Sequence, residues 1–258
     1  MCLFLLAYKQ HHQYPIIVAG NRDEFYTRPT APMRFWDYPS NILAGKDLQD
    51  GGTWFGITKN GNICAITNYR EMNQIPNATS RGWIAKNFLT NNHSCEQFFC
   101  ELELHANQYN GFNFIAGNVD SIYYYSNRNK QKKSPVKLQS GVYALSNHLL
   151  DTPWYKVLRS KKTFTAQLQS ETDIDFEQIF FMLADRQTAI KEELPNTGVG
   201  TAWEEILSSV FVNTIGYGTR TSYVLTIDYQ NRVSVVERTY NEETKLINEN
   251  SFDFIFST

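Results

Sequence analysis

The first 24 residues constrain the fold most strongly, because they contain two apolar runs separated by a short polar tip. Residues 2–8 have the composition of a buried strand, and residues 14–19 form a second apolar run after the polar residues 9–13. Two such runs around a polar tip are typical of a β-hairpin. Antiparallel pairing would place residues near position 20 opposite those near position 2. We therefore expect Arg22 and Asp23 to lie within reach of Cys2.

Cys2 allows two interpretations. Initiator methionine is generally removed when the second residue is as small as cysteine, which would leave Cys2 with a free α-amine. An α-amino group titrates near ~7.7–8.0 and can take the proton from its own thiol, directly or through a water. A nearby carboxylate would orient the amine, and a nearby guanidinium would favour the thiolate. In the structural interpretation, Cys2 is a small buried hydrophobe at a strand start, the commonest fate of a free cysteine.

The rest of the chain indicates the α+β class, because strands are expected in hairpins and helices in pairs. We predict further strands at residues 53–59, 62–68, 112–118, 121–126, 142–146, 221–228, 233–238 and 252–256. We predict helices at 81–91 with Ser80 as its cap, 95–107 with Ser94 as its cap, 153–170, 175–184 and 203–208. The Pro-rich, aromatic stretch 25–40 is predicted to be a wrapping loop. No repeat, linker or low-complexity tract appears, so we predict one domain over residues 1–258.

Composition excludes several classes of function. The 24 Lys and Arg residues nearly balance the 26 Asp and Glu residues, which argues against a nucleic-acid partner. The four cysteines show neither metal-ligand spacing nor the density of a disulfide-rich protein, so we predict no metal and a reducing compartment. No apolar run reaches the length of a membrane span, and no signal peptide is recognisable. We therefore expect a cytoplasmic protein without a membrane span.

Polar residues accumulate where the predicted strands end. Arg22 and Asp23 follow the second strand, Asn68 and Asn147 each end a later strand, and Arg220 precedes the last hairpin. Side chains at several strand ends can converge on one site. Two asparagine amides would be suitable donors to a developing oxyanion, because neutral N–H groups aimed at that charge help most when water is excluded. Each asparagine taken alone is also an ordinary turn residue.

Motifs along nearly the whole chain resemble those of the NRDE family, also called the transport and Golgi organization protein 2 family. The motifs that carry this resemblance are Cys2 directly after Met1, Asn21-Arg22-Asp23-Glu24, Leu43-Ala44-Gly45-Lys46-Asp47, Gly52-Thr53-Trp54-Phe55-Gly56-Ile57-Thr58, Thr67-Asn68, Ser80-Arg81-Gly82, Leu145-Ser146-Asn147, Pro153-Trp154-Tyr155-Lys156 and Tyr217-Gly218-Thr219-Arg220.

The family in turn is similar to N-terminal-nucleophile hydrolases of the bile-salt hydrolase and penicillin V acylase type. That similarity implies a four-layer αββα sandwich, in which two mainly antiparallel sheets are flanked by helices. It implies Cys2 as the nucleophile and Asp23 as the orienter of its amine. It implies Asn147 with Asn68 at the oxyanion hole and Arg220 near the thiolate.

Arg22 departs from the pattern of those hydrolases. Their N-terminal arginine lies three residues before the aspartate, a position that falls on Gly20 here. We keep Arg22 among the predicted catalytic residues, because it adjoins Asp23.

Two functions fit these expectations. The first is a cysteine hydrolase that acts on an amide or thioester bond of a small acylated substrate. The second is a protein without catalysis that binds and carries haem, acyl-coenzyme A or a lipid, which are the ligands associated with the family. Trp54, Phe55 and Phe25 are the predicted apolar wall for the substrate, although core packing explains them nearly as well.

We predict no cofactor, with haem as a candidate ligand or cargo. The five histidines are His11, His12, His93, His105 and His148, and no Cys-x-x-Cys-His attachment motif accompanies them. A lone histidine is more often structural than a ligand, so we predict no haem ligand among them.

Overall fold

The computed structural model describes residues 2–91, 93–132, 134–169 and 173–256, and these form two compact units. Unit 1 comprises Met1–Thr27, Ser140–Ser146 and Leu150–Asp253, and unit 2 comprises Arg28–Gln139, Asn147–Leu149 and Phe254–Thr258. Each unit contains one antiparallel sheet and its own helices, so each is described by itself.

The sheet of unit 1 has the strand order β10-β1-β2-β12-β13-β14, with the short β11 beside β12. Its strands are β1 (Cys2–Tyr8), β2 (Ile16–Phe25), β10 (Gly141–Leu145), β11 (Asn213–Thr214), β12 (Tyr217–Ile227), β13 (Arg232–Tyr240) and β14 (Leu246–Ile255). The N-terminal hairpin is confirmed, with Cys2 opposite Arg22 and Tyr8 opposite Ile16. The hairpin therefore lies inside the sheet, between β10 and β12.

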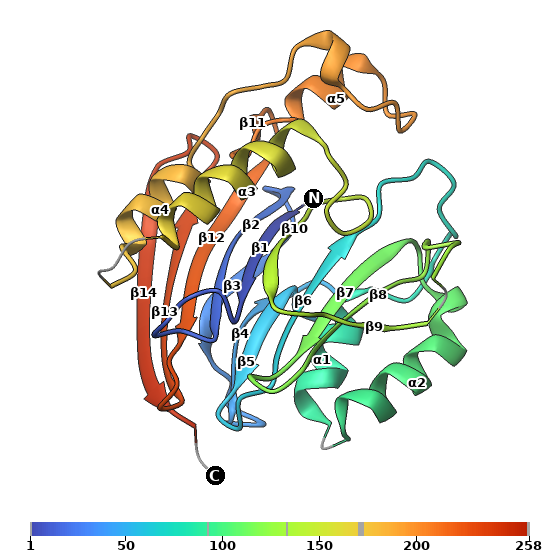
Figure 1. Ribbon diagram of the computed structural model, residues 1–258. Helices are drawn as coiled ribbons and strands as arrows, with labels where there is room; N and C mark the ends of the chain where they lie inside the picture. The colour runs from blue at the N-terminus through green and yellow to red at the C-terminus, as the bar shows by residue number, and fades with distance from the viewer. Residues whose placement is uncertain (1, 92, 133, 170–172, 257–258) are drawn as a thin grey trace. The chain divides into compact units, whose positions relative to one another are not determined.

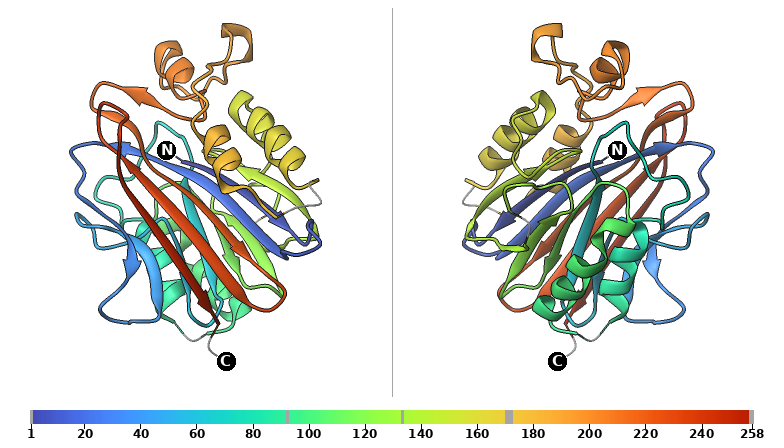
Figure 2. Two further views of the ribbon diagram at one scale, coloured as in Figure 1. Left: turned by 90° about the vertical axis from the view of Figure 1, so that its left-hand side faces the viewer. Right: turned by 90° about the vertical axis from the view of Figure 1, so that its right-hand side faces the viewer.

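Two helices cover one face of this sheet, α3 (Tyr155–Gln167) and α4 (Phe176–Leu183), and they lie side by side in Figures 1 and 2. Alternate residues of β1, including Leu3 and Leu5, pack against Phe164 of α3 and Ile179 of α4 in one apolar cluster. Asp175 caps α4 through its side chain, as its position before an apolar helix favours. A short helix, α5 (Thr201–Ile206), and the 3₁₀ turn Lys191–Glu193 complete the unit.

The sheet of unit 2 runs in sequence order from β3 to β9. Its strands are β3 (Thr30–Phe35), β4 (Ile42–Asp47), β5 (Phe55–Thr58), β6 (Ile63–Asn68), β7 (Phe112–Gly117), β8 (Ile122–Ser126) and β9 (Val136–Lys137). Helices α1 (Gly82–Thr90) and α2 (Cys95–His105), with the 3₁₀ turn Ala106–Gln108, pack against it through a core rich in phenylalanine. Ser94 caps α2 in a reciprocal capping box with Gln97, which confirms that prediction.

Several local predictions were wrong, and two of them have a clear physical reason. The predicted loop 25–40 contains β3, which tolerates Pro32 because β3 is an edge strand with a register shift between Ala31 and Arg34. Strand β2 continues to Phe25 because β12 pairs with it beyond the end of β1. Arg22 and Asp23 are thus inside the strand. The N-cap of α1 is Arg81 instead of Ser80, and α3 begins at Tyr155, two residues after Pro153.

The α+β class with two antiparallel sheets flanked by helices is confirmed. The predicted helix 153–170 ends at Gln167, and its last position lies outside the described residues. Within the described ranges, no helix has both the length and the apolar character that crossing a membrane requires.

Candidate functional site

Cys2 is the first residue of β1 and is partly exposed. It lies directly opposite Arg22 on β2, and directly opposed residues of an antiparallel pair project from the same face of the sheet. The Ser146 hydroxyl, just beyond β10, donates a hydrogen bond of 3.0 Å to the Cys2 carbonyl oxygen. The N-terminal cysteine is therefore held between two neighbouring strands, with a buried guanidinium on its own face.

Burial is the largest influence on the Cys2 thiol and raises its pKa above 9.0. The negative charge of Asp23 raises this pKa further, while Arg22 and the Asp23 backbone N–H lower it. The thiol is therefore protonated at neutral pH. A nucleophilic role for Cys2 consequently requires a base that accepts its proton.

Asp23 projects from the opposite face of β2, the face that α3 and α4 cover, because side chains alternate along a strand. Its carboxylate is fully buried and accepts a hydrogen bond of 2.7 Å from the Thr219 hydroxyl. Lys156 of α3 places its Nζ atom 3.9 Å from the other carboxylate oxygen. The Tyr217 hydroxyl donates to the Asp23 carbonyl oxygen at 3.1 Å. Asp23 is thus held by two elements besides its own strand.

Asn21 lies on the same covered face and joins β2 to the segments around it. Its amide nitrogen donates to the carbonyl oxygens of Leu183 at 2.8 Å and Val210 at 2.9 Å. Its side-chain oxygen accepts a hydrogen bond of 2.7 Å from Ser222 on β12. Asn21 therefore acts as a structural clamp for the strand that carries Arg22 and Asp23.

Gly20, the position of the hydrolases' arginine in the implied alignment, cannot carry a side chain here. A Cβ atom at Gly20 would lie 2.5 Å from the Tyr223 hydroxyl and 2.7 Å from the Leu3 carbonyl oxygen. Arg22 is two residues further along and shares the strand face of Gly20. The arginine on the Cys2 side of this strand is therefore Arg22.

Arg220 lies at the irregularity where the β2–β12 register shifts between Thr219 and Thr221. Its Nη1 atom donates to the carbonyl oxygens of Phe25 at 2.9 Å and Tyr26 at 3.4 Å. The guanidinium also lies 5.4 Å from the ring centroid of Tyr26. These contacts tie Arg220 to the end of β2, and Arg22 is one of the charges that act on the thiol of Cys2.

The two predicted oxyanion asparagines belong to unit 2, where they contact each other. The buried Asn147 side chain donates a hydrogen bond of 2.9 Å to the Asn68 carbonyl oxygen. The Asn147 carbonyl oxygen accepts from the backbone N–H of Arg70 at 2.7 Å. Asn147 directly follows Ser146, the residue that binds the Cys2 carbonyl oxygen.

The three residues of the predicted apolar wall differ in exposure. Phe55 is fully buried and Trp54 is 7% exposed, whereas Phe25 is 55% exposed. Trp54 packs over Gly45, where a Cβ atom would lie 2.4 Å from its ring. Phe25 makes an edge-to-face contact with Tyr217, with ring centroids 5.0 Å apart. Core packing therefore accounts for Trp54 and Phe55, and Phe25 is the one with surface available to a ligand.

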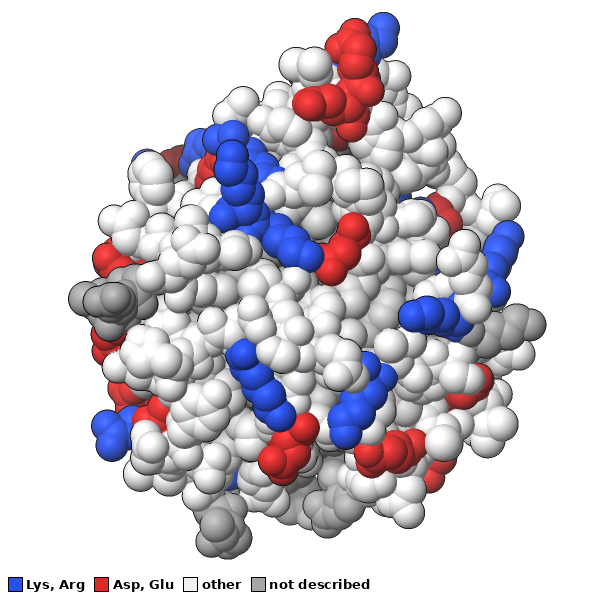
Figure 3. Space-filling model, in the orientation of Figure 1, with Lys and Arg blue, Asp and Glu red and all other residues white. Residues whose placement is uncertain are grey.

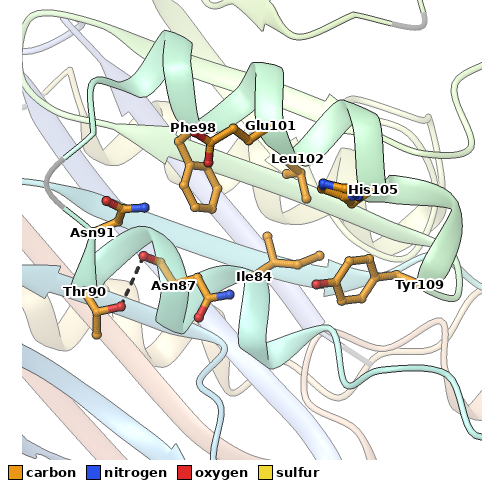
Figure 4. A pocket seen from close by; sticks show the side chains of 9 residues that line it. All are labelled: Ile84, Asn87, Thr90, Asn91, Phe98, Glu101, Leu102, His105 and Tyr109. Atoms are coloured by element: carbon orange, nitrogen blue, oxygen red, sulfur yellow. Dashed lines mark hydrogen bonds between the residues drawn. The ribbon is translucent and has the colours of Figure 1, made fainter.

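Two surface pockets lie on helices. A pocket of about 340 Å³ separates α1 from α2, and Figure 4 shows the α2 side chains Phe98, Leu102 and His105 pointing toward Ile84 of α1. A second pocket of about 730 Å³ lies along α3, lined by Pro153, Tyr155, Leu158, Arg159, Lys162, Thr163, Ala166 and Glu193. None of the predicted site residues lines either pocket. Within the described residues, no group of three or more His, Cys, Asp or Glu side chains is arranged to hold a metal ion.

Sequence reasoning did not single out Lys156 or Thr219 as individual site residues. Both occur in family motifs, in Pro153-Trp154-Tyr155-Lys156 and Tyr217-Gly218-Thr219-Arg220. The available signal was a lysine in the first turn of an amphipathic helix, where the positive end of the helix dipole disfavours a cation. Only the fold shows that this lysine lies beside Asp23.

The fold and this strand end define an α+β protein with a cysteine at position 2 beside the buried residues Arg22 and Asp23. The family model described as Transport and Golgi organisation 2 matches residues 1–242. The Transport and Golgi organization 2 homolog of Mus musculus is 32% identical, over 93% of this chain and 92% of its own length. The Homo sapiens homolog is 34% identical, over 87% of this chain and 86% of its own length. The chain belongs to the Transport and Golgi organisation 2 family.

Solved structures are similar at lower identity. One is a Caenorhabditis elegans ortholog of N-acylethanolamine-hydrolyzing acid amidase, at 9% identity and a TM-score of 0.48, over 71% of this chain and 86% of that one. Another is the C2A mutant of conjugated bile acid hydrolase from Clostridium perfringens, at 12% identity and a TM-score of 0.49, over 98% of this chain and 92% of that one.

Proposed function

We propose that this protein is an N-terminal cysteine hydrolase that acts on an amide or thioester bond of a small acylated substrate. The observation that carries the proposal is the position of Cys2. It is the second residue of the chain, it lies across the strand pair from the buried Arg22, and it adjoins the fully buried Asp23.

The proposed reaction begins after removal of Met1, which leaves Cys2 with a free α-amine. The thiol is protonated at neutral pH because burial raises its pKa, and the α-amine is the base that accepts its proton. The sulfur then attacks the acyl carbonyl, the leaving amine or thiol departs with that proton, and water hydrolyses the acyl-enzyme to a carboxylic acid. Arg22 favours the thiolate, and Asp23 orients the amine.

Asn147 and Asn68 are the proposed oxyanion donors. The hydrogen bond of 2.9 Å from the Asn147 side chain to the Asn68 carbonyl oxygen fixes the orientation of the amide, and a donor fixed in advance costs little reorganisation when charge develops.

The test compares two preparations that differ by one residue at the N-terminus. In one, tag cleavage leaves Cys2 first, and in the other an extra residue precedes Cys2. Both carry Cys100→Ser, which removes an exposed thiol elsewhere. We expect a short-chain acyl thioester to give an acyl-enzyme 1:1 by intact mass and then turnover, only where Cys2 is first. Equal acylation of the Cys2→Ala variant would refute the proposal.

A second candidate is binding of haem or of acyl-coenzyme A without turnover, and the pocket along α3 favours it. That pocket combines the apolar Leu158, which is 56% exposed, with Lys162 and with Arg159, whose guanidinium is paired with Asp185. Glu193 is the one acidic residue among the described residues of its lining. Figure 3 shows Lys and Arg side chains gathered over α3. An apolar wall beside cations suits an amphipathic anion.

Titration with haem and with long-chain acyl-coenzyme A tests this second candidate. Saturable binding that survives Cys2→Ser and is lost in Lys162→Glu would support it. If neither ligand showed saturable binding, this candidate would be removed.

A further inference from the structure

We propose that Lys156 is a positioning residue of the Cys2 site, whose buried ammonium holds the Asp23 carboxylate in place. This inference rests on the proposed hydrolase function for its consequence, although the coupling between the two residues can be measured without it.

The geometry around Asp23 carries the inference. The side chains of Lys156 and Asp23 are 1% and 0% exposed, and Nζ lies 3.9 Å from one carboxylate oxygen. The other carboxylate oxygen accepts the Thr219 hydroxyl at 2.7 Å. The carboxylate is therefore fixed by a cation from α3 at one oxygen and by a hydroxyl from β12 at the other.

The place of Lys156 in its helix has no local explanation. Lysine is almost never fully buried unless it is paired, and the first turn of a helix is the end at which the dipole disfavours a cation. Lys156 occupies that turn and is completely buried, with its backbone carbonyl oxygen bound by the Ser160 hydroxyl at 2.6 Å. The carboxylate of Asp23 supplies the favourable interaction that the helix does not.

Several other ionisable groups surround this pair. Arg22 and Tyr26 flank Asp23 on its own segment, Cys2 lies on β1, and Tyr217 lies on β12. Burying a charge is costly unless it is paired, and the contact at 3.9 Å pairs the buried carboxylate with the buried ammonium. Lys156 on α3 thus positions Asp23, and through Asp23 it affects the α-amine of Cys2.

A double-mutant cycle in thermal unfolding tests the coupling. Lys156→Met removes the charge at similar length, and Asp23→Asn removes its partner. We expect Lys156→Met alone to lower Tm by roughly 10 °C, because breaking a buried pair leaves an uncompensated charge. Adding Asp23→Asn should recover at least half of this loss. If the losses of Tm in the two single variants simply added in the double variant, the inference would be overturned. Failure of both Lys156→Met and the double variant to fold would overturn it too.

The pH dependence of acyl-thioester turnover separates positioning from simple stability. In the preparation with Cys2 first, the acid-side limb reports the α-amine, and Lys156→Met should move its midpoint up by about one pH unit, because the negative charge of Asp23 is then less neutralised. Lys156→Arg should restore it by keeping the charge. Lys161→Met is the matched control, because Lys161 lies on the same helix and pairs with Asp151 at the surface at 2.8 Å. A shift as large in Lys161→Met, or no shift in Lys156→Met, would overturn the inference.

The two proposals fail in different ways. Turnover by Cys2→Ala, or none by the wild type, would remove the hydrolase function, and the unfolding cycle would still decide whether Lys156 and Asp23 are coupled. An additive cycle would remove the role of Lys156 and leave the nucleophile untouched.

Discussion

The helix-covered faces of the two sheets contrast sharply in what they bury. In unit 2, the core beneath α1 and α2 is a large apolar cluster rich in phenylalanine. In unit 1, the core beneath α3 and α4 is apolar along most of β1 and β2 but becomes polar toward the end of β2, at Asn21 and Asp23. Burying a charge is costly unless it is paired, so buried ionic groups need a reason. The contrast is consistent with the proposal that the end of β2 is the functional region, and it makes the unit 2 core the stabilising one.

The largest expected effect is in the unit 2 core. Phe114 is fully buried, with its ring centroid 5.6–5.9 Å from those of Phe88, Phe98 and Phe99. Phe114→Ala should lower the free energy of unfolding by about 3–5 kcal/mol, because it leaves a cavity. Denaturant unfolding measures this. The same change at Phe181, which is 81% exposed, should cost less than about 0.5 kcal/mol. Equal losses at both positions would mean that this core is not the stabilising region.

The next effect concerns the clamp at Asn21. Asn21→Ala removes two donated hydrogen bonds and one accepted one, all buried, and should destabilise the fold by about 2–3 kcal/mol. Ser222→Ala removes only the hydroxyl that binds Asn21 and should cost about 1 kcal/mol. Chemical denaturation of both variants measures the difference. If Asn21→Ala lowered the free energy of unfolding by no more than Ser222→Ala does, the clamp would not hold β2 to the segments beyond its own sheet.

A polar contact in unit 2 gives a pH-dependent test of the comparison between the two units. Arg128 binds both carboxylate oxygens of Glu71, at 2.6 and 2.7 Å, and the Gly111 N–H donates at 2.8 Å. Burial raises the pKa of Glu71, but these hydrogen bonds outweigh it and lower the pKa below the usual 4.5. A lowered pKa means that the stabilisation is present above pH 4.5 and disappears as pH falls through the folded-state value.

Glu71→Gln should therefore cost about 1.5–2 kcal/mol at pH 7. The difference in the free energy of unfolding between Glu71→Gln and the wild type should shrink below pH 4.5, as urea unfolding over a pH series can show. A gap that stays constant down to pH 3 would assign the stabilisation to packing instead of charge.

The smallest expected effect decides which arginine acts on Cys2. Burial raises the pKa of the Cys2 thiol and Arg22 lowers it, so Arg22→Gln should move the midpoint of Cys2 alkylation upward by about one pH unit. Arg220→Gln should move it much less, because Arg220 binds the carbonyl oxygens of Phe25 and Tyr26. Peptide mass spectrometry after iodoacetamide treatment follows each rate, on chains with the same N-terminus. A larger shift in Arg220→Gln would restore the arrangement that the hydrolase similarity implies.

Sequence reasoning was most accurate where a signal is local. The N-terminal hairpin and the Ser94 cap are each set by residues within a few positions of one another, and both are present. It was wrong where a distant partner decides. Strand β3 exists because β4 pairs with it, despite Pro32, and β2 reaches Phe25 because β12 continues the pairing.

The amino-acid sequence by itself determined the α+β class, the family and the nearness of Cys2 to Arg22 and Asp23, because hairpin pairing and motif spacing are properties of the chain alone. Only the tertiary structure decided on which face each side chain lies. It put Arg22 on the side of Cys2, and it buried Asp23 beneath a helix whose Lys156 comes from more than 130 positions away. The reason is that strand alternation assigns two faces but does not say what covers each, and that cover is supplied by packing between distant segments.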